Sequence, residues 1–401
     1  MNHRERARVT YFWDRVRGAA MGCLEPYWQT FALLIAIRVF AAPDGVKAIL
    51  PMAFPIGFVL LPLTVPLAAR SGLRVSVVCA LSLAVSGSCL LASALVASLW
   101  MYVALAAASM IVIAQIVPFS TQIYAANYSA DERGRLFSTA FLLSSIIAVI
   151  AAYAGGRLLD FDLDYYPIIL VVAAASSFFG AFAFSRIPTE GFPLSSREPI
   201  SRSIGLLWSD RLFGRMQFGW SIIALGAMMI FPIRVEYMAN PLYNVNATNE
   251  QIGVVLGAVP LLARLVSTKV WGYLFDHFNV VSLRIALNLI TFFAILLFFG
   301  TTNLVLMAAS MMLYGVAYGG GRIMWQLWVT KIAPEEKVAS YMTVNSTVTG
   351  ILGLAAPAFG YAVLHYTNPA GVGWVAAFLL GLSTFIFLPA RSILDRRGRV
   401  G

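Results

Sequence analysis

Residues 75–96 read VSVVCALSLAVSGSCLLASALV, an apolar run without a single charged side chain. An α-helix rises about 1.5 Å per residue, so roughly 20 such residues cross the hydrocarbon core of a bilayer. The run is that long, and it lacks the regular alternation of apolar and polar residues that a strand of a membrane β-barrel shows. It therefore predicts a transmembrane helix, since helices and closed barrels are the structures that satisfy every backbone group in lipid.

Further runs of similar length and composition lie on both sides of this one. The whole chain of 401 residues is 60% hydrophobic and only 11% charged, whereas a soluble domain averages about 25% charged residues. These values predict an all-α polytopic membrane protein whose surface mostly faces lipid instead of water. The twelve predicted transmembrane helices are 18–42, 46–69, 75–96, 98–124, 136–158, 167–187, 214–238, 251–275, 284–300, 303–330, 342–365 and 373–390.

The net charge of +10 does not indicate nucleic-acid binding. The basic residues lie between the apolar runs and do not cluster on a polar or aromatic face. Their distribution follows the positive-inside rule, in which cytoplasmic loops are enriched in Lys and Arg. We therefore expect both termini in the cytoplasm and the chain in the cell (inner) membrane. The arginines assigned to the inner side are Arg4, Arg6, Arg8, Arg15, Arg17, Arg70, Arg74, Arg133, Arg135, Arg197, Arg202, Arg211, Arg215, Arg396, Arg397 and Arg399.

The longest polar connection, residues 188–213, divides the twelve predicted helices into two sets of six. The two halves share matched triplets, Ile37-Arg38-Val39 in the first span and Ile233-Arg234-Val235 in the seventh. Parallel repeats about an axis along the membrane normal are an established transporter plan. The sequence therefore predicts two pseudo-symmetric six-helix bundles. The predicted parts are a cytoplasmic N-terminal segment at 1–17, bundles at 18–187 and 214–390, a cytoplasmic linker at 188–213 and a cytoplasmic tail at 391–401.

The loop after the eighth span reads Gly272-Tyr-Leu-Phe-Asp276-His277. It resembles the signature of the major facilitator superfamily between spans eight and nine, which runs as glycine, three residues, aspartate and a basic residue. The corresponding loop after the second span departs from that pattern, with Val65 and Ala69 at the glycine and aspartate positions. The resemblance implies secondary transport by alternating access, with Gly272 and Asp276 as residues of a conformational signature.

A pairing between Asp276 and Arg322 is one expectation from this loop. Glycine permits close helix approach, and an aspartate at a helix end favours the positive N-terminus of a neighbouring helix. Arg322 on the tenth span could approach the same carboxylate. The fourth span has no arginine, which matches the missing aspartate of the first half. The alternative is that Arg322 lines the cavity and contacts no carboxylate.

Four arginines within spans are candidates for substrate binding, because intramembrane charges are costly and usually face a cavity or a partner. They are Arg264, Arg322, Arg38 and Arg234. Arg264 lies near the middle of span eight, too far from either interface to snorkel. It is predicted to bind an anionic substrate or a coupled carboxylate, with a structural ion pair as the alternative. Arg38 and Arg234 occupy matched places near the outer ends of spans one and seven and could clamp an anion. Alternatively, both snorkel outward, or Arg234 pairs with Glu236.

Glu25 precedes Pro26 in the cytoplasmic third of span one, and Gln29 lies one turn further along the same face. A buried carboxylate can carry a proton in a coupled transporter. We therefore predict proton coupling through Glu25, with a purely structural carboxylate as the alternative. Further side chains are candidates either for substrate contact or for interhelical hydrogen bonds. They are Gln29, Gln115, Gln122, Tyr153, Trp325, Gln326 and Asn345.

The residues do not favour metals, cofactors or catalysis. Cys23, Cys79 and Cys89 lie in apolar runs without CxxC spacing, and the three histidines lie far apart in sequence, so no metal or cofactor is expected. The chain has no GxxxxGK[ST] fingerprint, which argues against ATP-driven pumping. The glycines at 319–321 lie within a span, where they predict close helix packing. No Ser/His, paired-aspartate or histidine motif of a membrane enzyme lies within the spans.

These features predict a secondary active transporter that moves a small polar or anionic organic solute, with ion or proton coupling. The excess of intramembrane arginine over carboxylate favours an anion. A proton-coupled drug or multidrug exporter is one alternative, and the acidic side chain of Glu25 is compatible with it. A non-transporting sensor with a transporter fold is another. The expected partners are a small-molecule substrate and the lipid bilayer, and we expect a monomer that binds no nucleic acid.

Overall fold

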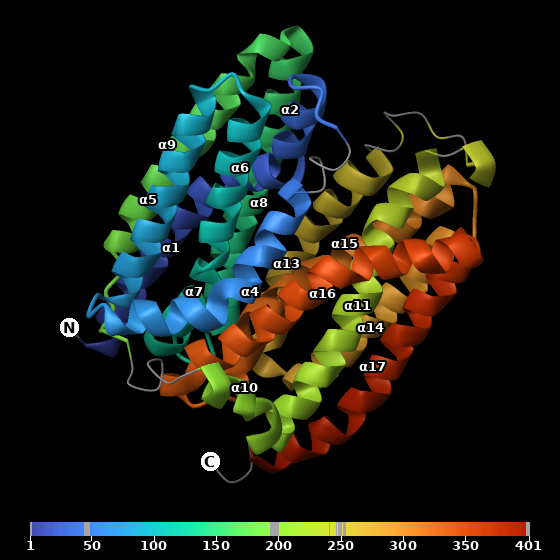
Figure 1. Ribbon diagram of the computed structural model, residues 1–401. Coiled ribbons are helices and arrows are strands. Elements are labelled where there is room, and N and C mark those ends of the chain that lie inside the picture. Colours follow the sequence, from blue (N-terminus) through green and yellow to red (C-terminus); the bar gives the residue numbers. More distant parts are fainter. Residues whose placement is uncertain are drawn as a thin grey trace. The chain divides into compact units, whose positions relative to one another are not determined.

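The computed structural model describes residues 2–43, 49–192, 200–239, 241–245, 247, 251 and 254–397 (Figure 1). These residues are almost entirely helical, and a single isolated bridge between Arg74 and Gly191 is the extended pairing found among them. Eleven helices of the described ranges are long and apolar enough to cross a membrane. The predicted all-α polytopic architecture is therefore confirmed.

The chain forms two compact units. Unit 1 comprises Met1–Ser203 with Ala333–Gly350, and unit 2 comprises Ile204–Ile332 with Ile351–Gly401. The predicted bundles lie in different units over most of their length. Residues 333–350, which belong to the second half of the sequence, are the exception, because they group with unit 1.

The helices of unit 1 follow the predicted spans of the first half. They are α1 (His3–Pro26), α2 (Ala32–Arg38), α4 (Ile49–Arg70), α5 (Val75–Ala94), α6 (Leu99–Ala114), α7 (Ile116–Asn127), α8 (Arg133–Phe161) and α9 (Tyr166–Ser185). Unit 2 contains α11 (Arg211–Ala239), α13 (Val259–His277), α14 (Val280–Phe299), α15 (Leu304–Leu327) and α17 (Pro369–Arg397). Helix α10 (Ile200–Ser209) crosses the boundary between the units, and α16 (Val338–Tyr366) begins in unit 1 and ends in unit 2.

Helix α1 begins well before the predicted first span, at His3. The side chain of Asn2 accepts a hydrogen bond from the backbone N–H of Glu5 at 2.8 Å, and the Glu5 carboxylate accepts one from Asn2 at 3.1 Å. This capping box fixes the start of the helix. Residues 3–17, predicted as a segment ahead of the first bundle, are therefore continuous with the first span. A π-helical turn, Tyr27–Phe31, joins α1 to α2.

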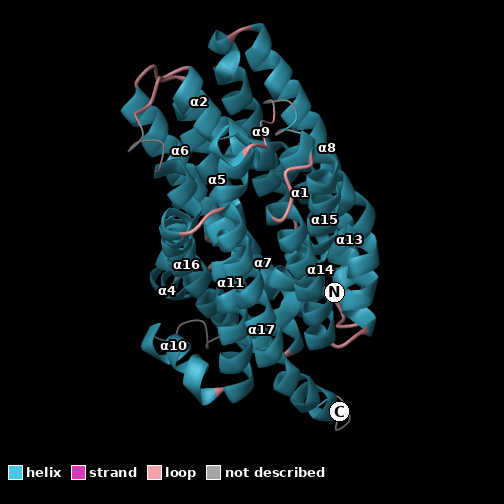
Figure 2. Ribbon diagram, turned by 90° about the vertical axis from the view of Figure 1, so that its right-hand side faces the viewer, coloured by secondary structure: helices cyan, strands magenta, loops and turns pink. Residues whose placement is uncertain are grey.

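The same pairs of spans pack together in both units. In unit 1, α4 packs on α6, α5 packs on α6 and α9, and α1 packs on α9. In unit 2, the corresponding spans pair as α13 on α15, α14 on α15 and α17, and α11 on α17. Figure 2 shows the short connections between the helices. The repetition of these contacts supports the predicted relation between the two halves.

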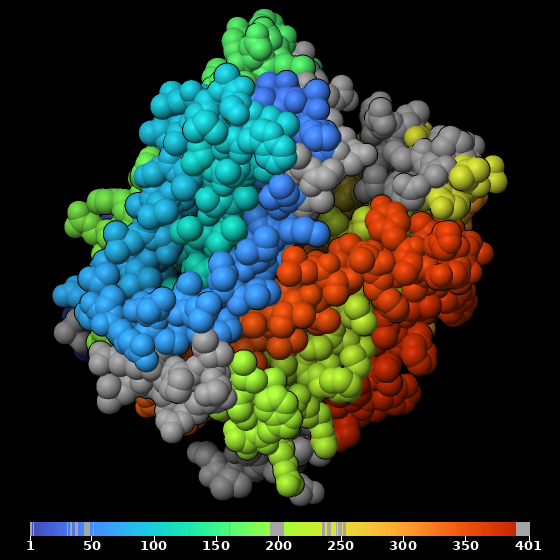
Figure 3. Space-filling model, viewed as in Figure 1, coloured from blue at the N-terminus to red at the C-terminus, as the bar shows by residue number. Residues whose placement is uncertain are grey.

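The outward faces of the helices are apolar, as a lipid environment requires. Figure 3 shows α4 in blue and α6 in cyan on one face of unit 1. On α4, Leu63 and Leu67 are exposed, and on α6 Trp100 and Met101 are exposed. Exposing so many large apolar side chains would be unfavourable in water, but it is favourable in hydrocarbon.

Glycines bring α13 and α15 into close contact. A Cβ atom on Gly315 would lie 2.3 Å from the backbone oxygen of Pro260. On Gly319 it would lie 2.8 Å from Ser267 Oγ, and on Gly320 it would lie 2.6 Å from the Trp271 ring. The close packing predicted at 319–321 is confirmed for these two glycines.

Replacing Gly315 with leucine is expected to destabilise unit 2, because no side chain fits between the two backbones. Overpacking of this kind costs about 1–3 kcal/mol or more. The expected result is a lower thermal unfolding midpoint in detergent and a loss of monodisperse protein on size exclusion. Gly321→Ala is the matched control, since no atom lies within 4 Å of a Cβ built there. Equal stability of both variants would show that α13 and α15 do not pack closely at Gly315.

Candidate functional site

Two buried arginines and two tyrosines of unit 2 form a continuous set of contacts. Arg234 on α11 is 7% exposed, and its Cζ atom lies 4.7 Å from the ring centroid of Tyr314. Tyr314 and Tyr318 on α15 stack with centroids 6.2 Å apart and planes 23° apart. Arg264 on α13 is 3% exposed, with its Cζ atom 5.7 Å from the Tyr318 centroid. We refer to these four residues as the arginine–tyrosine ladder.

The surroundings of Arg234 in the ladder are mostly aromatic and apolar. Its Cζ atom lies 5.1 Å from the ring of Phe231, and Nη1 lies 3.7 Å from the sulfur of Met311. Its Nε atom is buried without a hydrogen-bond partner. Among the described side chains, no carboxylate forms an ion pair with Arg234. The Glu236 side chain, the predicted alternative partner, lies outside the described residues.

This environment suits an acidic group attached to a flat or apolar body. Rings over a guanidinium each contribute about 0.5–2 kcal/mol, but they carry no charge that neutralises it. A carboxylate or phosphate can supply that charge through paired hydrogen bonds to the planar guanidinium. Intramembrane arginines at the centre of a bundle are otherwise expensive.

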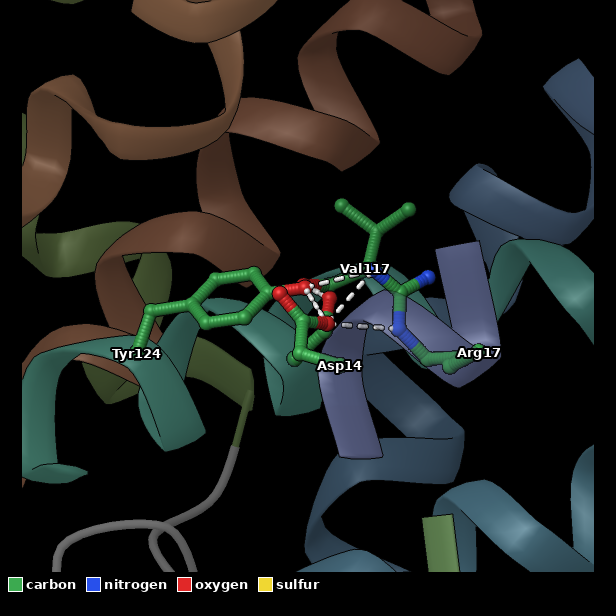
Figure 4. Close-up of polar contacts among 5 residues, drawn as sticks. Asp14, Arg17, Val117 and Tyr124 are labelled. Atoms are coloured by element: carbon green, nitrogen blue, oxygen red, sulfur yellow. Dashed lines mark hydrogen bonds and ion pairs between the residues drawn. The ribbon is translucent and has the colours of Figure 1, made fainter. Parts of the chain in front are cut away.

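A second polar cluster lies in unit 1 and was missed by the sequence analysis. Figure 4 shows Asp14 between Arg17 and Tyr124. The Asp14 carboxylate is fully buried, and its Oδ1 accepts hydrogen bonds from Arg17 Nε at 2.8 Å and from the Tyr124 hydroxyl at 3.0 Å. Arg17 also donates from Nη2 to the Tyr124 oxygen at 2.9 Å. The cluster connects α1 with α7.

The predicted proton-coupling residue lies further along α1. Glu25 is half-buried, and its Oε1 accepts a hydrogen bond from Gln29 Nε2 at 3.0 Å. The prediction that the two side chains share one face of the helix is therefore confirmed. Proton coupling through Glu25 stays a prediction.

The two glutamines on the fourth predicted span make interhelical hydrogen bonds, the structural alternative for such residues. Gln115, between α6 and α7, accepts a hydrogen bond from Thr64 and donates to the backbone oxygen of Gly57 at 2.8 Å, which joins this junction to α4. Gln122 on α7 donates to the backbone oxygen of Glu335 at 2.8 Å and accepts from the N–H of Ala339 at 3.0 Å. Both contacts of Gln122 lie within unit 1.

The remaining candidates are dispersed. Asn345 is fully buried, with Nδ2 3.7 Å from the sulfur of Met342, and Gln326 is also buried. Tyr153 is 71% exposed on α8, so the structure does not join it to the ladder. The Arg38 side chain lies outside the described residues.

The signature residues on α13 occupy different environments. Gly272 is buried and Asp276 is half-buried. Arg322 on α15 is exposed, and its Cζ atom lies 5.8 Å from the ring of Trp325. The association of Arg322 with Asp276 stays a prediction.

A pocket of about 210 Å³ lies in unit 1, and none of the ladder residues lines it. Its lining is largely polar and includes Arg6, Gln122, Glu190, Glu335 and Glu336. Three carboxylates against one guanidinium make this pocket unsuitable for an anion. We therefore place the candidate anion site at the ladder on grounds of charge, not of cavity size.

Comparison with known proteins decides the family. The model of the Major Facilitator Superfamily matches residues 20–357 and 218–399. The chain belongs to the major facilitator superfamily. It is therefore a multi-pass membrane transporter of the secondary class and not an enzyme.

Relatives within the superfamily are distant. Multidrug resistance protein MdtH of Aeromonas salmonicida (strain A449) is 25% identical over 256 residues, which cover 62% of this chain and 61% of that protein. MdtH of Aeromonas hydrophila matches with the same identity and coverage. The match thus spans about three fifths of the length of these curated relatives.

Solved structures share the superfamily fold over nearly the whole chain. A bacterial homologue of the iron transporter ferroportin in the outward-facing state has a TM-score of 0.74 at 14% identity, with 96% of this chain and 99% of that chain covered. The transporter FucP in the outward conformation gives 0.73 at 12% identity, with 95% and 99% covered. The human organic anion transporter MFSD10 gives 0.67 at 16% identity, with 96% and 100% covered. Identities this low show the fold alone.

Proposed function

We propose that this superfamily member transports organic anions by alternating access, and that a proton gradient drives the transport. The observation that carries the proposal is the arginine–tyrosine ladder of unit 2. Arg234 and Arg264 are 7% and 3% exposed, and each guanidinium lies over a tyrosine ring. A buried cation among aromatic rings binds an acidic group more favourably than a cationic one.

The tyrosine pair adds a preference for the body of the substrate. Tyr314 and Tyr318 present stacked rings between the two guanidinium groups. Flat or aromatic groups gain about 0.5–1.5 kcal/mol from such rings beyond the burial of their area. The proposed substrate class is therefore a carboxylate or phosphate on a planar or apolar organic body. One structural neighbour is described as an organic anion transporter, which agrees with this class.

A drug exporter is the second candidate, because the curated relatives are multidrug resistance proteins. The ladder favours anions over the cationic compounds that an acidic binding site would select. We further propose a monomer in the cell (inner) membrane with both termini in the cytoplasm, as the distribution of arginines among the loops suggests.

The proposed function is tested by flux measurements in proteoliposomes. The purified protein is reconstituted, a pH gradient is imposed, and uptake is measured for matched aromatic carboxylates and aromatic amines. Saturable, gradient-dependent uptake of the carboxylates supports the proposal. Uptake of the amines alone would favour the cationic-drug exporter, and no flux of any compound would favour the sensor.

Replacing Glu25 with glutamine is expected to separate coupling from transport. The amide keeps the size of the side chain but cannot bind and release a proton at Glu25, so uptake driven by a pH gradient is lost. Exchange of labelled for unlabelled substrate at equal pH needs no net proton movement, and it stays within about threefold of the parent protein. Glu5→Gln, at the exposed start of α1, is the matched control. Full gradient-driven uptake by the Glu25 variant would remove Glu25 from the coupling step.

A further inference from the structure

A third buried arginine of unit 2 lies outside the ladder, near the start of α14. Arg284 is 5% exposed, and its Nε atom donates a hydrogen bond to Asn288 Oδ1 at 2.8 Å. Asn288 in turn donates from Nδ2 to Ser383 Oγ at 2.8 Å and to Thr384 Oγ1 at 3.3 Å. The guanidinium is therefore held in place by a network that reaches α17, and its Nη atoms make no hydrogen bond that is found among the described residues.

One tryptophan lies beside this guanidinium, and a second tryptophan stacks on the first. The Arg284 Cζ atom lies 4.8 Å from the centroid of the Trp220 ring on α11. Trp220 stacks on Trp328 with centroids 5.8 Å apart and planes 28° apart. The indole Nε1 atoms of both rings are buried and donate to no acceptor among the described residues. A buried N–H group without an acceptor is costly, so both indoles are also available donors.

The charges around Arg284 favour the binding of a negatively charged group. Within the ranges that the structure describes, no carboxylate forms an ion pair with Arg284. Helix α14 begins at Val280, so Arg284 lies near the positive end of the helix dipole, where a cation is disfavoured. Burial of the charge adds a further cost. Neither the helix dipole nor any carboxylate among the described side chains therefore compensates the guanidinium.

We propose that Arg284, Trp220 and Trp328 form a second anion site, separate from the transport ladder, that binds a phosphate group. The fork of the guanidinium matches two phosphate oxygens, and indole N–H groups donate to the others. The phosphate belongs either to the headgroup of an anionic phospholipid or to a free phosphate ion. The site does not depend on the identity of the transported substrate.

The test is the thermal unfolding midpoint of the full chain in neutral detergent. Inorganic phosphate is titrated against chloride at equal ionic strength, and phosphatidylglycerol is compared with phosphatidylcholine. A ligand that binds the folded state raises the midpoint in proportion to its saturation. A rise with both phosphate and phosphatidylglycerol supports a site open to free anions, and a rise with phosphatidylglycerol alone supports a lipid headgroup. A rise with neither would overturn the proposal.

Variants test whether the rise in the unfolding midpoint comes from the cluster of Arg284, Trp220 and Trp328. Arg284→Gln is expected to abolish the rise, whereas Lys269→Gln, an exposed residue outside both sites, is expected to retain it. Trp220→Phe and Trp328→Phe keep a stacked ring and remove one N–H each. If Arg284→Gln does not fold, these two variants decide the matter. Each is expected to raise the half-saturating ligand concentration about fivefold. A parent-like response in Arg284→Gln, or in both phenylalanine variants, would contradict the proposal.

Discussion

Replacing Arg264 with glutamine lowers kcat/KM for organic-anion transport about 10- to 100-fold. The guanidinium is 3% exposed and lies over the ring of Tyr318, so water cannot take over its role. A hydrogen bond to a charged group contributes about 1.5–3 kcal/mol, and each 1.4 kcal/mol is about tenfold. Glutamine keeps two N–H donors but not the charge. Initial uptake rates in proteoliposomes over a range of substrate concentrations measure the effect.

Lys269→Gln on the same helix is the matched control for Arg264→Gln. Lys269 is exposed, and snorkelling explains its presence near the end of a span. It is expected to change kcat/KM by less than about threefold. Thermal unfolding midpoints of both variants show whether either has lost its fold. Parent-like transport by a folded Arg264→Gln protein would exclude the ladder as the anion site.

Replacing Asp14 with asparagine lowers the free energy of unfolding by about 3–5 kcal/mol, the range found when one partner of a buried ion pair is removed. The Asp14 carboxylate is fully buried and accepts from both Arg17 and Tyr124. Without its charge, the Arg17 guanidinium is left without its ion-pair partner inside unit 1. The measurement is the thermal or detergent-induced unfolding of the purified protein.

Two further variants make the Asp14 result specific. Removing both charges, as Asp14→Asn with Arg17→Met, is expected to restore a large part of the lost stability, because no buried charge is then uncompensated. Glu190→Gln breaks the exposed ion pair between Arg6 and Glu190, which contributes at most about 1 kcal/mol. A double variant no more stable than Asp14→Asn would show that the two groups are not coupled.

The transmembrane architecture could be predicted from the sequence because hydropathy and helix length act locally. Residues 75–96 contain no charge, and α5 occupies Val75–Ala94. The capping box at Asn2 and Glu5 was present in the sequence, and its significance was missed because the charged residues of 1–17 were assigned to a terminal segment. The burial of Asp14 could not be predicted from its neighbours in the sequence, because its partner Tyr124 lies 110 residues away in the chain.

The candidate site could be predicted only in part. The sequence identified Arg234 and Arg264, because charge within an apolar run is visible without any structure. It did not identify Tyr314 and Tyr318, although their spacing of four residues places them one turn apart on one helix face. It also missed Arg284, which stood at the first residue of a predicted span and so resembled an interfacial residue. The contact of Arg284 with Trp220 joins α14 to α11, and Asn288 links the guanidinium to α17, so the cluster depends on packing among three helices.

The most direct test of the central claim compares an anion with its neutral counterpart. Binding of an aromatic carboxylate and of its methyl ester is measured by isothermal titration calorimetry on the parent protein and on Arg264→Gln. The ladder predicts that the parent binds the carboxylate at least about tenfold more tightly than the ester and that Arg264→Gln binds the two about equally. Equal binding of acid and ester by the parent, or an unchanged preference in Arg264→Gln, would contradict the claim that this buried guanidinium recognises the charge of the substrate.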